Sequence, residues 1–536
     1  MPIRTDERPQ TGAEQHRAWW KEGSAYQIYP ASFWDSTGSD IGDLKGIISK
    51  VDYLKLLGVD IVWLFPIFES SQIDMIDPQC GSIEDVDVLK VELHGRDMKL
   101  VLDLVMNHTS DQHEWFKQSR SSKDNEYRDW YTWKKPKFDA QGNRQPPNNW
   151  QSHFQARTST PEKEAHGSST RGEYYLHLYC KEQPDLNWET PAVQRAVHET
   201  VRFWLNRGVD GFRIDVINFV SKDQAFPDSD GKVRYPGTEF YAAGPRLHEY
   251  LQELGFTLEE YDAFSVGEMP CVTDTHEIIK SVQSGRGELN MIFHFELRVS
   301  WTSTTARAVT RFGNDDPAYR AQSAKMLALF LGFQSGTLSA YQGQELGMHN
   351  MPKEWSMDEY KDVDCLTHWK AITDHATPSE LAAFRAEYRN KSRDNARTPM
   401  QWDATAPHGG FSLLLDDAVD TREPQPRLGR QRRRPSGRPG VRVPLLEGAV
   451  LAARRQLADA LADERVFAYL RASSAAGGGR GERVAVVCNF SAYVVVWEGL
   501  PGRVCEVVLS TTGKGVEDFE GGRVQLSPYE AVAVLC

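Results

Sequence analysis

Cysteine is scarce in this chain of 536 residues: there are seven, they lie far apart, and no two form a CxxC pair. An odd, scattered set argues against a disulfide framework and suits a reducing compartment. Two further absences concern membranes. No apolar run approaches the roughly 18 residues of a spanning helix, and residues 1–17 lack the apolar core of a signal peptide. The sequence therefore predicts a cytoplasmic protein.

Positive charge is also in short supply. The chain has 62 Lys and Arg against 75 Asp and Glu, which gives a net charge of −13. This balance argues against binding to nucleic acid or to an anionic membrane surface. No glycine fingerprint of the dinucleotide-binding or P-loop type follows the first predicted strand. We expect a monomer that acts on a small molecule and binds neither nucleic acid nor membrane.

What the sequence does contain is a regular alternation of short apolar runs and helix-patterned segments. Strands are predicted at residues 24–33, 59–66, 99–105, 209–217, 264–269, 289–295 and 338–342. Helices are predicted between them, at residues 45–57 and 191–206. Such alternation is typical of parallel βα units, in a (βα)8 TIM barrel or in an open doubly wound sheet. The missing glycine fingerprint favours the barrel.

Other segments fall outside this alternation. Residues 1–17 are a polar tail, and residues 107–186 predict an inserted, loop-rich subdomain on the catalytic face of a barrel that takes residues 18–106 and 187–403. Residues 404–447 include an Arg/Pro/Gly-rich run and are predicted to be irregular or disordered. Residues 448–536 predict a helix at 449–462 and a small C-terminal β-sandwich domain with strands at 483–490, 493–498, 504–509 and 531–535.

The stretch GVDGFRIDVINFV at residues 208–220 has the period-2 pattern of a strand with two different faces. Arg213 and Asp215 point to the same face, and a guanidinium beside a carboxylate favours the ionised carboxylate. An ionised aspartate at the end of a buried strand can be a nucleophile or a stabiliser of positive charge. A structural Arg–Asp pair that closes the strand fits the spacing equally well.

A second carboxyl ends the strand FSVGEM, where Glu268 follows Asp215 by 53 residues. Its neighbours in sequence carry no charge, and a desolvated carboxyl without a partner tends to stay protonated and can act as an acid. One ionised and one protonated carboxyl at adjacent strand ends are the minimal apparatus for cleaving a glycosidic bond. A separation of about 5–5.5 Å would predict retention of configuration.

Five motifs occur in series: DLVMNH, QPDLN, GFRIDV, VGEMP and RDNARTPMQWD, at residues 103–108, 183–187, 211–216, 266–270 and 393–403. In this order they resemble the α-amylase family (glycoside hydrolase family 13), in its oligo-1,6-glucosidase and α-glucosidase branch. The resemblance covers about residues 19–403. It implies a retaining exo-α-glucosidase that needs no cofactor and acts on short oligosaccharides, with Asp215 as nucleophile and Glu268 as general acid and base.

The same resemblance assigns the residues that hold the sugar. It places Asp103, His108 and Arg397 in the glucose pocket, and it implies that Arg213 steers the nucleophile. Val216, directly after the nucleophile, is similar to members that prefer α-1,6 links. For His108 a buried structural role is the alternative.

A loop at residues 35–43, DSTGSDIGD, resembles the calcium loop of relatives. The resemblance implies Asp35, Thr37, Ser39, the Ile41 carbonyl and Asp43 as ligands. Thr37 and Ser39 replace an amide and a carboxylate, so a structural Ca²⁺ would bind weakly. The alternative is a turn that caps the helix beginning at Leu44.

The family pattern is broken at two places. After the second strand a GYDISDY-like segment is absent, and no ENHDQ-like motif precedes the RFGND at residues 311–315. Arg311 follows Glu268 by 43 residues, which by the family's measure is too short by one βα unit. We therefore expect an incomplete barrel that lacks its seventh strand and a third carboxylate, with two exposed edges.

Several explanations stay open. The sequence is a faulty translation of an intact α-glucosidase gene, or it is that of a decayed, inactive relative. A catalytically inactive α-amylase-like binding module is a competing function. A transglycosylating isomerase of sucrose or maltose would share the same residues.

Overall fold

The computed structural model describes residues 18–68, 75–153, 159–161, 172–293, 306–334, 336–352, 354–412, 464–472, 483–500 and 502–536. The predicted tail, residues 413–447 of the segment predicted to be irregular, and the predicted helix at 449–462 lie outside these residues. Within them, no helix is long and apolar enough to cross a bilayer.

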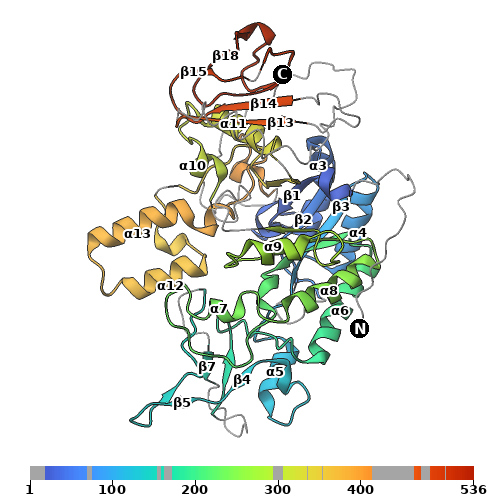
Figure 1. Cartoon of the computed structure of the whole chain (residues 1–536), viewed down its shortest axis with the longest axis vertical. Helices are drawn as coiled ribbons and strands as arrows, with labels where there is room; N and C mark the ends of the chain where they lie inside the picture. Colours follow the sequence, from blue (N-terminus) through green and yellow to red (C-terminus); the bar gives the residue numbers. More distant parts are fainter. Residues whose placement is uncertain are drawn as a thin grey trace.

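The centre of the molecule is a curled sheet of seven parallel strands in the order β11–β10–β9–β3–β2–β1–β12 (Figure 1). The strands are β1 (Ser24–Ile28), β2 (Ile61–Leu64), β3 (Lys99–Val105), β9 (Gly211–Asp215), β10 (Phe264–Glu268), β11 (Met291–Phe293) and β12 (Leu338–Tyr341). Each lies within one of the seven predicted runs. The last strand pairs with the first, as in a barrel, so the predicted βα barrel architecture is confirmed.

This barrel is open between β11 and β12. Among the described residues, each of these two strands pairs on one side only. The two edges approach each other at their amino-terminal ends, where the Thr337 hydroxyl lies 3.3 Å from Met291 Sδ. Seven strands in barrel order with one gap agree with the expected loss of the seventh strand. Residues 294–305, which lie between β11 and α10 in the chain, are outside the described part.

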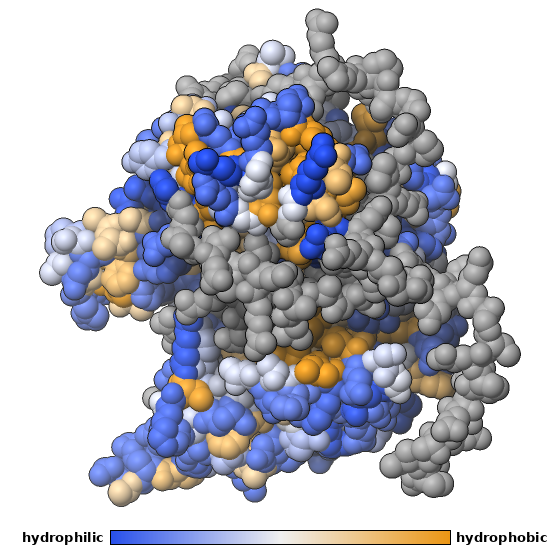
Figure 2. Space-filling model, turned by 45° about the horizontal axis from the view of Figure 1, so that its top comes forward, coloured by the Kyte–Doolittle hydropathy of each residue, from blue (hydrophilic) through white to orange (hydrophobic). Residues whose placement is uncertain are grey.

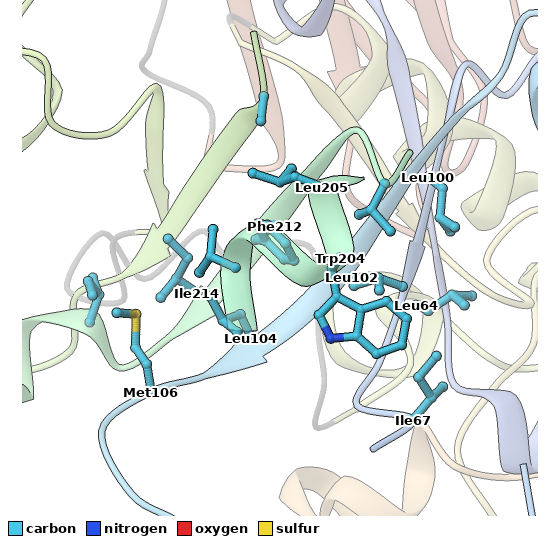
Figure 3. Close-up of a cluster of buried hydrophobic side chains, with 14 of the residues drawn as sticks. Leu64, Ile67, Leu100, Leu102, Leu104, Met106, Trp204, Leu205, Phe212 and Ile214 are labelled. Carbon is cyan, nitrogen blue, oxygen red and sulfur yellow. The ribbon is translucent and has the colours of Figure 1, made fainter. Parts of the chain in front are cut away.

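Helices cover the outer face of the sheet: α2 (Leu44–Ile48), α3 (Val51–Leu57), α4 (Ile83–His94), α6 (Pro191–Asn206), α8 (Leu247–Glu259) and α9 (Thr275–Val282). The apolar stripe of α6, which includes Trp204 and Leu205, packs on outward side chains of β3 and β9 such as Leu102 and Phe212 (Figure 3). The predicted helix at 45–57 is in fact two short helices. The break falls at Ser49 and Lys50, where the Lys50 N–H bonds the Ile47 carbonyl three residues back.

The inner face of the sheet is filled with large apolar groups. Trp63, Phe264 and Val266 form one buried cluster with Ile61 and Val101. Helix α1 (Trp19–Glu22) adds two indole rings at the amino-terminal ends of the strands, where Trp19 and Trp20 lie 5.6 Å and 5.7 Å from the Phe264 ring. The interior of the barrel is therefore closed at that end.

An inserted region follows β3 and projects below the sheet in Figure 1. It holds α5 (Glu114–Ser121) and the short strands β4 (Trp133–Lys134), β5 (Lys137–Phe138), β6 (Arg144–Gln145), β7 (Ser159–Pro161) and β8 (Tyr174–Leu176). Backbone bridges from His108 to Asp185 and from Tyr131 to Leu186 draw the two ends of this region together beside the barrel. Further along the chain, α12 (Val363–Ile372) and α13 (Pro378–Lys391) form a protruding helical hairpin.

The C-terminal part is built of antiparallel sheets, as expected for a β-sandwich domain. One has the order β13–β14–β19–β16 and the other β15–β18–β17. Their strands are β13 (Val466–Ala472), β14 (Arg483–Asn489), β15 (Val495–Glu498), β16 (Glu506–Ser510), β17 (Phe519–Glu520), β18 (Arg523–Leu526) and β19 (Ala531–Leu535). Helices α10 (Ala308–Phe312) and α11 (Arg320–Gly332) pack against the first sheet. Figure 2 shows apolar and hydrophilic side chains interspersed on this domain.

Candidate active site

The predicted catalytic side chains lie together at the carboxyl ends of three adjacent strands. Asp103 on β3 is in register with Arg213 on β9, and Glu268 is the last residue of β10, the next strand. Alternation along β9 turns Phe212 and Ile214 outward into the helix-facing core and leaves Arg213 and Asp215 on the inner face. The sheet itself therefore gathers residues that are distant in sequence.

Arg213 is the hub of this group. Its Nη1 donates to Asp103 Oδ1 at 2.6 Å and to Asp215 Oδ1 at 2.8 Å, and its Nη2 forms an ion pair with Glu268 Oε1. Arg213 is 7% exposed, and the centre of its guanidinium lies 5.8 Å from the Trp63 ring. One buried cation thus holds both carboxyl groups that glycoside cleavage requires.

The electrostatics of the site follow from three carboxyl groups around one cation. Burial raises the pKa of Glu268 to about 8, although Arg213 acts in the opposite direction; the charges of Asp215 and Asp103 add to the rise. Burial likewise raises the pKa of Asp103 to about 7 against the effect of Arg213. The group therefore holds protons near neutral pH, and Glu268 can supply one.

This geometry corrects one expectation. The sequence around Glu268 offers no charged neighbour, yet pairing of β9 with β10 brings Arg213 into contact with it. The raised pKa persists because burial outweighs the attraction of the guanidinium for the carboxylate. A contact between strands cannot be read from the residues that flank Glu268 in the chain.

Val216 leaves the strand in an unusual conformation. Its φ of 36° lies in the left-handed region, where a β-branched residue is strained. The turn leads into a short 3₁₀ helix, η3 (Ile217–Phe219), and buries the Val216 side chain among Trp150, Phe219 and Tyr241. Val216 thus lies in an apolar cluster beneath the inserted region, and not within the ionic group.

His108 lies three residues after the end of β3 and is buried against the inserted region. Its Nε2 is 3.1 Å from the Gln183 side-chain nitrogen, and its ring lies 5.4 Å from that of Tyr179. Burial lowers the pKa of His108; the charge of Asp215 opposes this and that of Lys222 adds to it. The neutral ring is therefore the stable form beside the ionic group.

Arg397 lies on the other side of the site. Its guanidinium is 5.3 Å from the Tyr29 ring, and Tyr29 contacts Phe65. These two aromatic residues follow β1 and β2, so Arg397 lies over strand ends that β3 separates from β9. The structure gathers Asp103, Arg213, Asp215 and Glu268 by direct contact, whereas Arg397 lies beside Tyr29 at the end of β1.

Two neighbours of the ionic group were not anticipated. Trp63 underlies Arg213, and its inward position could be found from the alternation of Ile61 and Trp63. Tyr179 has a hydroxyl pKa raised by burial and by the charges of Asp215 and Glu268. No signal in the sequence marks Tyr179, because it comes from the inserted region.

The candidate calcium loop uses its carboxylates internally. Asp35 accepts hydrogen bonds from the backbone N–H groups of Thr37, Gly38, Ser39 and Asp40. Asp43 accepts from the Ser36 backbone and hydroxyl and caps α2 by accepting from the Gly46 N–H. Ser39 donates to the Ile41 carbonyl at 3.2 Å. As arranged, this donor set fits a turn and N-cap, and the described residues contain no cluster of three or more His, Cys, Asp or Glu side chains suited to a metal.

The chain is similar in sequence to proteins of known function. The family model described as "Alpha amylase, catalytic domain" matches residues 27–306 and 299–420. The α-glucosidase of Schizosaccharomyces pombe is 48% identical over 449 residues, 74% of this chain and 76% of that protein. The oligo-1,6-glucosidase of Parageobacillus thermoglucosidasius is 43% identical, over 74% and 77% respectively.

Solved structures agree with these sequence matches. Trehalose-6-phosphate hydrolase from Bacillus licheniformis has a TM-score of 0.77 and 32% identity, covering 96% of this chain and 99% of that one. An isomaltulose synthase mutant from Erwinia rhapontici, in complex with sucrose, has a TM-score of 0.80 and 30% identity, covering 97% and 100%.

Proposed function

Because this chain belongs to the α-amylase family of glycoside hydrolases, we propose that it is a retaining α-glucosidase that releases terminal α-linked glucose from short oligosaccharides. The observation that carries the proposal is the pairing of Asp215 and Glu268 with one shared buried cation, Arg213. Two carboxyl groups at neighbouring strand ends match the chemistry of retaining glycosidases.

The mechanism assigns one role to each carboxyl. Asp215 attacks the anomeric carbon and forms a glycosyl ester, while Glu268 gives its proton to the leaving oxygen. Glu268 then takes a proton from water, whose oxygen attacks the anomeric carbon and frees Asp215. The raised pKa of Glu268 keeps the proton available for the first step.

The surrounding residues would hold the sugar. We assign Asp103 and His108 to the glucose pocket beside the carboxyl pair, and Arg397 to its far rim. Val216 would act on linkage preference indirectly, through the buried cluster that supports the turn after Asp215. The α-1,6 and α-1,4 links are both candidates, since relatives are named for oligo-1,6-glucosidase and for α-glucosidase activity.

A second candidate is a transglycosylating isomerase of sucrose. The similarity to isomaltulose synthase structures favours it, and the same two carboxyl groups would serve. The two functions differ in what resolves the glycosyl ester: water gives free glucose, whereas a bound fructose gives an isomer of sucrose. Retention of both carboxyl groups speaks against a purely non-catalytic binding module.

The test is an assay of the purified full chain on p-nitrophenyl α-glucoside, isomaltose, maltose and sucrose, with products followed by NMR. We expect glucose to be released first as the α-anomer, and Asp215→Ala to abolish release. No release by the wild type, or undiminished release by Asp215→Ala, would overturn the hydrolytic proposal. Formation of a sucrose isomer instead of glucose would establish the second candidate.

A further inference from the structure

Lys222 is a buried lysine seven residues after Asp215, beyond η3. Its side chain is 4% exposed. Its Nζ donates to the Phe219 carbonyl at 2.6 Å and to Asn107 Oδ1 at 3.1 Å. A charged group is seldom buried to this extent unless its hydrogen bonds are satisfied, and these two bonds tie the turn after the nucleophile strand to the segment after β3.

Asn107 links Lys222 to Asp185. It is fully buried, and its Nδ2 donates to Asp185 Oδ1, whose second oxygen accepts from the Leu178 N–H at 3.0 Å. A lysine can only donate and an ionised carboxylate can only accept. The two partners therefore fix the orientation of the Asn107 amide, with its oxygen toward Lys222 and its nitrogen toward Asp185.

The fixed amide faces His108. Asn107 Nδ2 lies 3.4 Å from His108 Nδ1. The Gln183 side-chain nitrogen lies 3.1 Å from the other ring nitrogen, Nε2, so the His108 ring is held between the side-chain amides of Asn107 and Gln183. Burial and the charge of Lys222 both lower the pKa of His108, against the charge of Asp215, in agreement with a neutral ring.

We propose that Lys222 is a positioning residue which, through the Asn107 amide, sets the orientation of the His108 ring in the glucose pocket. Lys222 touches neither of the catalytic carboxyl groups in the described contacts. The inference rests on the proposed function, because it takes His108 as a ligand of the sugar.

The experiment measures sugar binding, which does not require turnover. The affinity of 1-deoxynojirimycin, an iminosugar shaped like glucose, is measured by calorimetry for the wild type, Lys222→Met, His108→Ala and the double variant. We expect Lys222→Met to raise Kd about 10-fold. In the His108→Ala background the same substitution should raise Kd less than about 2-fold, because its target has gone.

Lys99→Met is the matched control. Lys99 is the first residue of β3, the strand that Asn107 follows. Its Nζ donates to Asp210 at 2.8 Å, at the end of the sheet remote from His108. This variant should leave Kd unchanged. Thermal unfolding is recorded for every protein, since a merely structural role would lower Tm without coupling to His108.

A second variant covers the case in which Lys222→Met does not fold. Asn107→Asp keeps an acceptor for Lys222 but removes the amide donor that binds Asp185 and faces His108 Nδ1, and the same rise in Kd is expected. Equal effects of Lys222→Met in both backgrounds, or unchanged binding by Lys222→Met or Asn107→Asp, would overturn the positioning role. Binding without hydrolysis would overturn only the proposed function, whereas absence of binding by the wild type would overturn this inference too.

Discussion

Two parts of the central sheet differ in how completely their strands are paired. The arc β3–β9–β10 is paired on both sides, and its inner face carries the ionic group around Arg213. The two edges of the sheet are β11, only three residues long, and β12. Within the described residues, each of them pairs on one side only. Closure of the barrel and assembly of the carboxyl pair are therefore separable: in the described part of the chain the first is incomplete while the second is intact.

The first prediction breaks the intact arc. Arg213→Gln leaves three carboxyl groups without their buried cation, so we expect kcat/KM to fall by more than about 100-fold. The free energy of unfolding should fall by about 3–5 kcal/mol, measured in urea. Arg202→Gln removes the half-exposed ion pair with Glu260 on the outer helices and is the control. Similar losses in both variants would contradict the hub role of Arg213.

The second prediction repairs the two open edges. Replacing residues 294–305 by a strand–helix unit of the family pattern, with its acidic residue, should close the sheet and return the missing carboxylate. We expect kcat to rise by about 100-fold, with Tm as a second measure. The control carries the same unit with the acidic residue changed to Ala. An unchanged rate would show that the chain works as an open barrel. Sequencing the transcript then tells whether the unit is encoded.

The third prediction concerns the proton on Glu268. Because burial raises its pKa to about 8, the acid form persists at neutral pH and is lost above that value. The rate should therefore be sustained to about pH 8 and decline as pH rises further. The pH profile of kcat/KM on p-nitrophenyl α-glucoside measures this. A decline that begins near pH 5 would show an ordinary, exposed carboxyl.

The fourth prediction concerns His248, which joins α8 to α9 and to the segment before the edge strand β11. His248 on α8 lies 2.8 Å from both Glu288 and Glu277, with one carboxylate at each ring nitrogen. Hydrogen bonds to Glu288 and then Glu277 raise the pKa of His248 above that of the unfolded chain, although burial opposes them. The stabilisation is therefore complete below about pH 6.5 and is lost as pH rises through the raised pKa.

His248→Gln should cost roughly 1–2 kcal/mol of unfolding free energy at pH 6 and clearly less at pH 9. Urea unfolding at the two pH values measures the difference. His276→Gln is the control, because His276 is exposed and bonds only Asp274 on its own helix terminus. A loss of unfolding free energy that does not depend on pH would exclude stabilisation by the protonated His248.

The smallest effect is expected from calcium. The carboxylates of Asp35 and Asp43 already accept hydrogen bonds within their own loop, so we expect weak binding at most. Treatment with EDTA should change Tm by less than about 1 °C, because little binding energy is linked to folding. A shift of several degrees that added Ca²⁺ reverses would instead support the ligand set implied by the resemblance.

The sequence predicted much of the fold where patterns are local. β3 and α6 begin and end at the predicted residues, because each is a single apolar run with clear limits. The predicted run at 289–295 shortens to the three residues of β11, which has a partner on one side only. β13 was not predicted, and the predicted helix at 45–57 is divided at Ser49.

The candidate site shows the same limit. Asp215 and Glu268 could be chosen from motifs, and their shared cation could not, because it depends on which strands are neighbours. The left-handed φ of Val216 had no signal in a β-branched residue. The Lys222–Asn107–Asp185 connection joins three segments that only the fold brings together.

The two indole rings of α1 bear on how the enzyme would turn over. Trp19 and Trp20 cover the sheet at the end remote from the carboxyl pair, and apolar side chains fill the interior, so the interior offers a sugar no passage to that end. A glucose unit that enters at the carboxyl ends of the strands would have to leave from the same side. Each cycle would then include an emptying step, and free glucose in the medium would compete with the next oligosaccharide for the same entrance.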